Sequence, residues 1–263
     1  MKRSPPRPPN ERSRSPRGPL EILHGHRAVR AVLARRPDAV TRVGCAIGLR
    51  EELRAFRGEV QELSDAELSR IAGTDLHEGF VVEVAPPRYL PLAELGELLL
   101  RNRGVAVALD RVRNPYNVGA ILRSAAFFGV DALLLGAPAP HPGLAPDAVR
   151  VAEGGAEHVA LARTTDLADS LARLRERGVQ IVGTHVTDAE PALGFAFAHP
   201  TVLVLGNERE GMSDRVRAAC SACVKIDGSG AVESLNVAVA AGVLIAEAIR
   251  HRAAERPRRT QGR

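Results

Sequence analysis

From residue 104 to residue 250, short apolar runs alternate with longer segments of helical periodicity, and this alternation limits the possible folds more than any other feature. The apolar runs predict strands at 104–109, 131–136, 157–162, 179–184, 201–206 and 223–226. The segments between them predict helices at 117–128, 145–153, 165–177 and 234–251. This is the pattern of an α/β fold whose parallel sheet is covered by helices on both faces. Ligands of such sheets bind beyond the carboxyl ends of the strands, so we expect the chemistry in the loops there.

A smaller α/β unit precedes this segment. Residues 24–36 have helical spacing, and 39–47 and 79–87 have the pattern of strands. Residues 49–72 predict one or two helices, the second with Ser64 and Glu67 as a capping box. The chain therefore divides into a disordered basic tail at 1–19, a small α/β domain at 20–86, a linker at 87–103 with a short helix at 91–101, a large α/β domain at 104–251 and a basic tail at 252–263.

The net charge of +5 is unevenly distributed. Residues 1–19 carry +5 and residues 251–263 carry +4, which leaves −4 for the rest of the chain. Basic tails on a mildly acidic globule are typical of nucleic-acid binding, but they also serve solubility, and charge alone does not choose between these roles. With only eight aromatic residues and no Trp, the chain is poorly equipped to read single-stranded RNA by stacking.

Several classes of protein are excluded. No apolar run is long enough to cross a bilayer, and the Pro- and Arg-rich N-terminus lacks the apolar core of a secretory signal. Three cysteines cannot form a disulfide scaffold, so the cytosol is the expected compartment. We expect no metal site, because a single C-x-x-C pair at Cys220 and Cys223, and His24 and His26 two residues apart, do not form a ligand set. We interpret Cys223 as a core residue and Cys220 as a residue on a helix surface.

The loop after residues 104–109 is the first of three with unusual composition. Asn114 and Pro115 form a turn, and Asn117 is placed to cap the helix that follows. Gly119 and Arg123 are four residues apart and share one face of that helix. A helical glycine costs about 1 kcal/mol relative to alanine, so it either lets a ligand approach Arg123 or lets the helix pack closely.

The other two loops follow later strands. The run 201–205 leads into Gly206, Asn207 and Glu208, with Gly211 shortly after, and Ser213 with Asp214 begins a helix. The strand at 223–226 leads into a glycine-rich loop that ends at 234–236. The helix after it is apolar on all sides from residue 237 to residue 246, so it is buried on every side or packs against a partner subunit.

Together, in this order, the three loops resemble the signature motifs of the SpoU family of SPOUT RNA ribose 2′-O-methyltransferases. The pattern N-P-x-N-x-G-x-x-x-R occupies 114–123, G-x-E-x-x-G occupies 206–211, and S-L-N-V occupies 234–237. Residues 20–86 resemble the substrate-binding domain that precedes the catalytic domain in many members, through HGHRAV at the start and LHEGFVVEV at the end.

The resemblance implies a catalytic domain with a deep trefoil knot, a homodimer, and S-adenosylmethionine as the methyl donor. It implies that the cofactor binds at Thr184, Leu205, Gly206, Ile226, Ser234 and Leu235. It implies that the reaction is carried by Arg123, Asn117, Glu208, Asn236 and Ser234. Because an arginine does not give up its proton near neutral pH, we expect Arg123 to bind the ribose oxygen and a phosphate, with Asn117, Glu208 and Asn236 orienting both Arg123 and the ribose.

One departure from the family pattern concerns the cofactor loop, where Asp227 stands in place of the usual proline after Ile226. This adds a carboxylate and removes a rigid φ angle. The leading hypothesis is ribose 2′-hydroxyl methylation of structured RNA, with 23S rRNA favoured because a separate N-terminal domain is present. The alternatives are a tRNA 2′-O-methyltransferase and a non-catalytic RNA- or ribosome-binding protein with a degenerate cofactor site.

Overall fold

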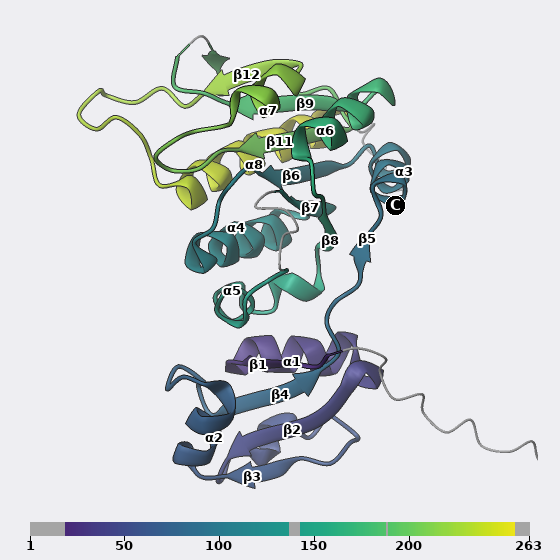
Figure 1. The fold of residues 1–263 in the computed structure, drawn as a ribbon, viewed down its shortest axis with the longest axis vertical. Helices are drawn as coiled ribbons and strands as arrows, with labels where there is room; N and C mark the ends of the chain where they lie inside the picture. The colour runs from purple at the N-terminus through teal and green to yellow at the C-terminus, as the bar shows by residue number, and fades with distance from the viewer. Residues whose placement is uncertain (1–18, 137–142, 188, 256–263) are drawn as a thin grey trace, which may run out of the picture.

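The computed structural model describes residues 19–136, 143–187 and 189–255, which form two sheets with their helices (Figure 1). The expected tail at 1–19 lies almost wholly outside the described residues, as does the expected C-terminal tail from residue 256 onward. Residues 252–255, which were expected to belong to that tail, instead end the last helix, and Arg252 forms a 2.8 Å ion pair with Asp131. In the described part of the chain, no helix combines the length and apolar character needed to cross a membrane.

The small domain is built on a four-stranded sheet of order β1-β4-β2-β3. Its strands are β1 (Glu21–His24), β2 (Val40–Ala46), β3 (Gln61–Leu63) and β4 (Phe80–Val84). Helix α1 (His26–Arg35) packs its apolar face, Ala28, Val29, Val32 and Leu33, into the main core. Helix α2 (Asp65–Ala72) packs with Leu63 and Val81 in a separate small core, so helices cover both faces of the sheet.

The capping box at Ser64 and Glu67 is confirmed, and it begins α2 as expected. The rest of 49–72 differs from the prediction. Only a 3₁₀ segment at Arg50–Leu53 forms there, and β3 was missed. A three-residue strand is too short for its periodicity to be recognised in the sequence.

The large sheet is all parallel, with the order β10-β12-β9-β11-β6-β7-β8-β5. Its strands are β5 (Tyr89–Leu90), β6 (Val105–Leu109), β7 (Ala132–Leu135), β8 (Ala160–Arg163), β9 (Gln180–Thr184), β10 (Glu190–Pro191), β11 (Thr201–Leu205) and β12 (Ala222–Lys225). Its helices are α3 (Leu92–Asn102), α4 (Pro115–Phe128), α5 (Pro146–Val151), α6 (Leu167–Glu176), α7 (Asp214–Ala219) and α8 (Val237–Glu255). A 3₁₀ segment, Gly155–Glu157, joins α5 to β8.

Alternate residues of the central strands face opposite layers of helices, because these strands are apolar on both faces and both faces must be buried. Val105 and Val107 of β6 face a core with α4, α5 and α8, whereas Ala106 and Ala108 face one with α3, α6 and α7. The first core continues through α5 into α1 and β4, so the two domains share buried apolar side chains. Figure 1 shows this stacking, with α5 and the 3₁₀ segment between α4 and α1.

Two predicted segments need correction. The strand expected at 157–162 begins only at Ala160, because Gly154 and Gly155 divert the chain into the 3₁₀ segment first. Residues 89–102, expected to be a linker with a short helix, form β5 and α3 as part of the large sheet's own layers. Leu95 and Leu99 of α3 are fully buried there, which explains why this segment is rich in leucine.

Candidate active site

Asp110 and Arg111 connect the loop after β6 to the loop after β11. Asp110 is buried, and its Oδ2 accepts a 2.7 Å hydrogen bond from the Ser213 amide. Arg111 Nη2 donates to the Gly211 carbonyl at 3.1 Å, and Asn207 Nδ2 donates to the Arg111 carbonyl at 3.1 Å. Sequence reasoning missed Arg111, since its role depends on a φ of 61°, which nothing in the pattern marks at an arginine.

Helix α4 is capped by Asn114, and the prediction that Asn117 is the cap is wrong. The Asn114 Oδ1 accepts from the Tyr116 amide at 2.9 Å, and Pro115 is the first helical residue. Proline suits that position because its φ is already helical and its missing N–H would have no partner there. Asn117 therefore lies inside the first turn, where its side chain is available for other contacts.

The side chains of Asn117, Glu208 and Asn236 meet, one from each of the three loops singled out in the sequence. Asn117 Nδ2 donates to Glu208 Oε1, and Asn236 Nδ2 donates to Asn117 Oδ1 at 3.1 Å. Asn236 Oδ1 also accepts from the Ala238 amide at 2.8 Å and so caps α8. This chain of hydrogen bonds fixes both amide groups and holds the start of α4, the loop after β11 and the start of α8 together.

Gly119 does not open a path for a ligand to Arg123. A Cβ at this position would lie 2.6 Å from the Ala148 carbonyl oxygen and 2.7 Å from the Val151 Cβ. Of the two roles expected for this glycine, the structure supports close helix packing, because the missing side chain lets the backbone of α4 approach α5. This close approach positions the turn after α5 beneath the middle of α4.

Arg123 lies six residues beyond Asn117, about 9 Å further along the helix axis at 1.5 Å per residue. Its Nη1 contacts Glu153 Oε1 at 2.9 Å, and its side chain is 54% exposed. The structure thus unites three of the expected catalytic residues but holds Arg123 in a contact with Glu153, which the sequence analysis did not identify. The sequence signal for Glu153 is an acidic residue that stands directly before two glycines, Gly154 and Gly155.

Three of the expected cofactor positions lie at the carboxyl ends of adjacent strands. The sheet order β12-β9-β11 places the ends of these strands side by side. Thr184 ends β9 in register with Val224 of β12, and its hydroxyl donates to the Val204 carbonyl of β11 at 3.1 Å. Leu205 is buried at the end of β11, and Ile226 after β12 packs on the main core. The partly buried Ile226 offers an apolar surface for an adenine ring and the loop backbones suit polar groups, so these positions fit S-adenosylmethionine.

The loop that carries Ser234 and Leu235 extends outward from the large domain in Figure 1, between β12 and α8. Ser234 is exposed, and Leu235 is 46% exposed, so an apolar side chain is presented beside the strand ends. Asp227, the departure from the family pattern, lies 3.3 Å from Lys225 Nζ, and both side chains are exposed. The added carboxylate is therefore offset by a neighbouring ammonium.

Cys220 is not on a helix surface as expected. It caps α7, packs with Cys223 against the core beneath β9, and donates from Sγ to the Val216 carbonyl at 3.4 Å. Burial, with the neighbouring Cys223 thiol, raises the pKa of Cys220 to about 12, so this thiol is protonated and unreactive at neutral pH.

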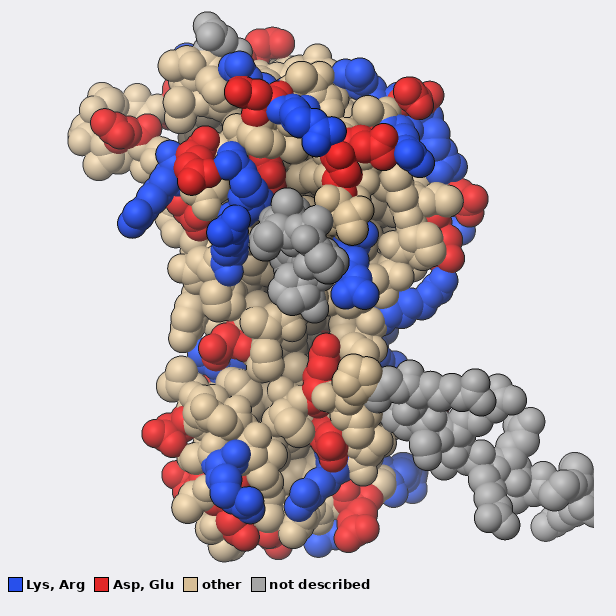
Figure 2. All heavy atoms as spheres, in the orientation of Figure 1, with Lys and Arg blue, Asp and Glu red and all other residues tan. Residues whose placement is uncertain are grey.

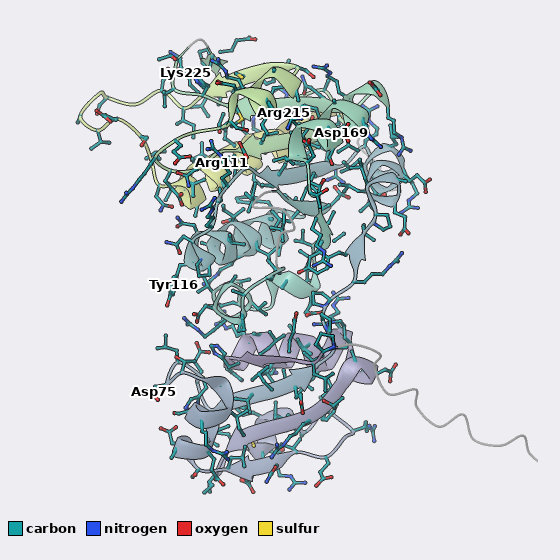
Figure 3. All side chains as sticks on the ribbon, viewed as in Figure 1. Asp75, Arg111, Tyr116, Asp169, Arg215 and Lys225 are labelled. Carbon is teal, nitrogen blue, oxygen red and sulfur yellow. The ribbon has the colours of Figure 1, made fainter. Side chains whose placement is uncertain are left out.

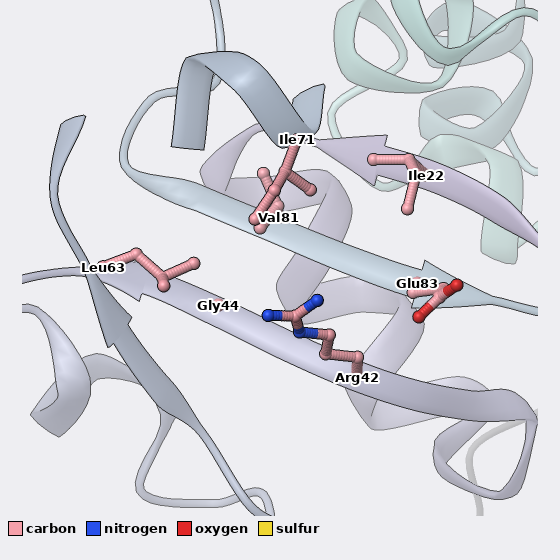
Figure 4. A pocket seen from close by; sticks show the side chains of 7 residues that line it. All are labelled: Ile22, Arg42, Gly44, Leu63, Ile71, Val81 and Glu83. Carbon is pink, nitrogen blue, oxygen red and sulfur yellow. The ribbon is translucent and has the colours of Figure 1, made fainter. Parts of the chain in front are cut away.

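Two other surface features differ from this site. Basic and acidic side chains are interspersed on the face of the large domain that carries Arg111 and Arg215, as Figures 2 and 3 show, and both arginines pair with carboxylates. A pocket of about 80 Å³ lies on the sheet of the small domain, and Figure 4 shows Gly44 and Val81 beneath it with Arg42 and Glu83 at one end. This volume is small beside the roughly 300–1,000 Å³ of ordinary ligand sites, so the pocket does not compete with the strand ends.

Known proteins of similar sequence and structure match along most of the chain. Residues 104–246 match the SpoU rRNA Methylase family, and residues 22–90 match the RNA 2′-O ribose methyltransferase substrate binding family. The chain is 36% identical over 243 residues to the 23S rRNA (guanosine-2′-O-)-methyltransferase RlmB of Pseudomonas aeruginosa, covering 88% of this chain and 97% of the relative. It is 34% identical to RlmB of Vibrio cholerae, covering 90% and 99%.

A solved structure adds a relative with a bound cofactor. The SpoU methyltransferase AviRb from Streptomyces viridochromogenes, in complex with AdoMet, is 26% identical. It superposes with a TM-score of 0.75 over 90% of this chain and 92% of its own. Because the family match covers more than half of the chain and the relatives align over nearly their full length, this chain belongs to the SpoU rRNA methylase family.

Proposed function

We propose that this protein transfers the methyl group of S-adenosylmethionine to a ribose 2′-hydroxyl of 23S rRNA. The observation that carries the proposal is the meeting of Asn117, Glu208 and Asn236, which come from the segments that follow β6, β11 and β12. The relatives named as 23S rRNA guanosine-2′-O-methyltransferases support the choice of RNA, and they align over both domains.

The residues of the chain perform separate tasks in this proposal. The cofactor, when bound, supplies a methyl group on a sulfonium. The backbones around Thr184, Gly206 and Leu235 hold it at the strand ends, with Leu205, Ile226 and Ser234 completing the binding surface. The amides of Asn117 and Asn236, fixed through Glu208, orient the ribose so that oxygen, methyl carbon and sulfur align.

Arg123 binds the ribose oxygen and an adjacent phosphate. An arginine guanidinium carries a permanent positive charge in proteins, so this side chain stabilises negative charge as the hydroxyl ionises. A lower hydroxyl pKa increases the fraction of the oxygen that is ionised and able to attack, and the released proton passes to solvent water, not to the arginine. The planar guanidinium presents five N–H donors, enough to hold a phosphate and the ribose oxygen together.

We also infer a homodimer. Helices α4 and α8 pack together, and both carry exposed apolar side chains: Phe127 is 82% exposed and Val239 is 54% exposed. Exposed apolar side chains on two packed helices fit a second copy of the same surface across a two-fold axis. In the first half of α8, residues 237–246, the side chains that face away from the main core are small or apolar, as expected of an interface helix.

We further propose that the large domain is a trefoil knot and that the protein acts in the cytoplasm. The knot is supported by β12, which follows β11 in sequence but lies beyond β9 in the sheet, while α8 returns to pack on α4. The compartment is supported by Cys45, Cys220 and Cys223, all of which are free thiols.

A labelling experiment tests the function. The purified protein is incubated with methyl-labelled S-adenosylmethionine and unmodified 23S rRNA or tRNA transcripts, and the RNA is then digested with alkali. Label in alkali-resistant dinucleotides from 23S rRNA, and its loss in Arg123→Ala, is the expected result. Label in dinucleotides from tRNA alone would show that the substrate is tRNA and not rRNA. Label in mononucleotides would indicate base methylation. If no label is transferred to either RNA, the result favours the alternative that the protein binds RNA without catalysis.

A further inference from the structure

The carboxylate of Glu153 lies between two arginines that belong to different domains. Its Oε1 is 2.9 Å from Nη1 of Arg123 on α4, and its Oε2 is 2.6 Å from Nη1 of Arg27 on α1. Each oxygen therefore serves one guanidinium, one from the catalytic domain and one from the substrate-binding domain. Two guanidinium groups this close would repel each other without the negative charge between them.

The backbone fixes the position of this carboxylate. Glu153 has a φ of 48°, and Gly154 follows with a φ of 87°, so the chain turns sharply after α5. A Cβ on Gly154 would lie 2.9 Å from the Ala31 Cβ, and one on Gly155 would lie 3.1 Å from the Leu122 carbonyl oxygen. The turn is thus wedged between α1 and α4 and cannot shift without separating the helices.

The left-handed conformation at Glu153 is itself informative. Glycine and asparagine adopt such a φ readily, whereas glutamate reaches it only at a cost. Strained backbone is found preferentially where a side chain has a functional task. Here the strain directs a carboxylate at Arg123, and a glycine, which would relieve it, would remove that carboxylate.

We propose that Glu153 is the positioning residue of Arg123, and that its second oxygen couples Arg123 to the substrate-binding domain through Arg27. The inference rests on the proposed function, in which Arg123 binds the ribose oxygen and a phosphate. Arg123 is 54% exposed on a long flexible stem, so without a partner it would sample many rotamers. A fixed carboxylate at one Nη selects the rotamer and leaves the other donors of the guanidinium for RNA.

The coupling through Arg27 gives the arrangement a second role. Arg27 lies on the helix of the small domain that faces α5, and it is 68% exposed, so RNA bound to the small domain can reach it. Arg27 holds the second oxygen of the carboxylate, so a change in this contact alters how firmly the Glu153 side chain, on its fixed backbone, holds Arg123. Binding of substrate by one domain is thereby communicated to the residue that acts in the other.

Methyl transfer by variants of the intact protein tests this inference. Glu153→Ala is compared with wild type under saturating S-adenosylmethionine, with kcat and the KM for RNA measured separately by the alkali-resistance assay. We expect kcat to fall about tenfold while the KM for RNA changes less than about twofold, since misplacement of a catalytic group slows chemistry more than it weakens binding. Glu153→Asp retains the charge one methylene shorter and should recover part of the loss.

Two further comparisons separate positioning from a structural effect. The double variant Glu153→Ala with Arg123→Ala should be no slower than Arg123→Ala alone, because the carboxylate acts only through that arginine. Arg27→Ala should lower kcat in wild type but have no effect in the Glu153→Ala background. Melting followed by circular dichroism should show all variants folded at the assay temperature.

The domain interface offers a matched control. Glu157 forms an ion pair with Arg36 at 2.8 Å, which joins the same two domains but does not contact Arg123. Glu157→Gln should therefore leave kcat within about twofold of wild type if positioning, and not domain attachment in general, is the cause.

Three results would overturn the inference while leaving the proposed function intact. The first is a Glu153→Ala variant that keeps the kcat of wild type although the Arg123→Ala variant is inactive. Another is an increase in activity, which would mean that Glu153 competes with RNA for Arg123. The third is an equal loss in Glu157→Gln. An inactive wild-type protein would overturn the proposed function itself, and this inference with it.

Discussion

Gly119 of α4 faces the carbonyl oxygen of Ala148 on α5 so closely that a Cβ atom would lie 2.6 Å from that oxygen. The absence of a side chain at this position therefore sets the distance between the two helices. The turn after α5 carries Glu153, which contacts Arg123 one turn further along α4. A packing glycine in the first motif thus determines where the proposed catalytic arginine finds its partner.

We predict that Gly119→Ala destabilises the protein even though alanine favours a helix by about 1 kcal/mol. The new methyl group meets a backbone carbonyl that cannot rotate away, and such overpacking costs about 1–3 kcal/mol. Urea unfolding measures the difference, and kcat should fall as well, since α5 and Glu153 are displaced.

Gly96→Ala in α3 is the matched control for this substitution. Its Cβ would meet the end of the Arg177 side chain, which is flexible and can move. Helix propensity should then dominate, and stability should be unchanged or slightly increased. Equal destabilisation of both variants would show that contact with backbone is not the deciding factor.

Much of the fold followed from the periodicity of the sequence, and the failures have physical causes. The central strands were found because Val202 and Leu203 are buried on opposite faces of one sheet, which leaves a continuous apolar run. The edge strands β5 and β10 have two residues each and carry no such signal. Asn117 was mistaken for a helix cap because Asn114 and Asn117 are both good caps, and only Pro115 distinguishes them.

The candidate site likewise contains some residues that the sequence predicted and others that it did not. Motif spacing singled out Asn117, Glu208 and Asn236, and the structure brings their side chains together. Motif spacing could not reveal Glu153 or Arg111, because both depend on left-handed backbone conformations of non-glycine residues. Their contacts arise from tertiary packing, which sequence periodicity does not encode.

We predict that Asn117→Asp impairs methyl transfer in a pH-dependent manner. The substitution replaces a donor by a carboxylate beside Glu208, and losing this hydrogen bond costs about 1–3 kcal/mol, which corresponds to a decrease in kcat of about 5- to 150-fold at pH 8. Two adjacent carboxylates raise the pKa of one of them, so the pair binds a proton as the pH falls and the hydrogen bond forms again. The ratio of variant to wild-type kcat should therefore rise between pH 8 and pH 6.

The double variant Asn117→Asp with Glu208→Gln provides the internal control. The glutamine amide can donate to the new carboxylate, which restores the hydrogen bond in the opposite direction. We expect partial recovery of kcat and a pH profile parallel to that of wild type. A pH-independent defect in the single variant would argue against contact between these side chains during turnover.

The exposed apolar side chains of α4 and α8 predict the oligomeric state. Phe127→Glu and Val239→Glu each place a charge in the inferred dimer interface, so sedimentation should show a monomer where wild type is a dimer. Ile47→Glu is the control, because Ile47 is 75% exposed but lies in the small domain. A wild-type protein that sediments as a monomer at micromolar concentration would contradict the inferred dimer.

Glu247 of α8 predicts a loss of stability at acidic pH. Hydrogen bonds from Arg250 and from the Gly194 amide lower the pKa of this carboxyl to about 2 from a usual 4.5. Since the folded pKa is lowered, the stabilisation is fully present above pH 4.5 and is lost as the pH falls towards 2. Arg250 is 60% exposed, so solvent screens the pair, and we expect a contribution of only about 1 kcal/mol. Urea unfolding of wild type and Glu247→Gln should therefore differ at pH 6, differ less at pH 3 and converge only as the pH approaches 2. Glu59→Gln, at an exposed position, should follow wild type throughout, and a Glu247→Gln deficit as large at pH 2 as at pH 6 would show that shape, not charge, holds the Gly194 loop on α8.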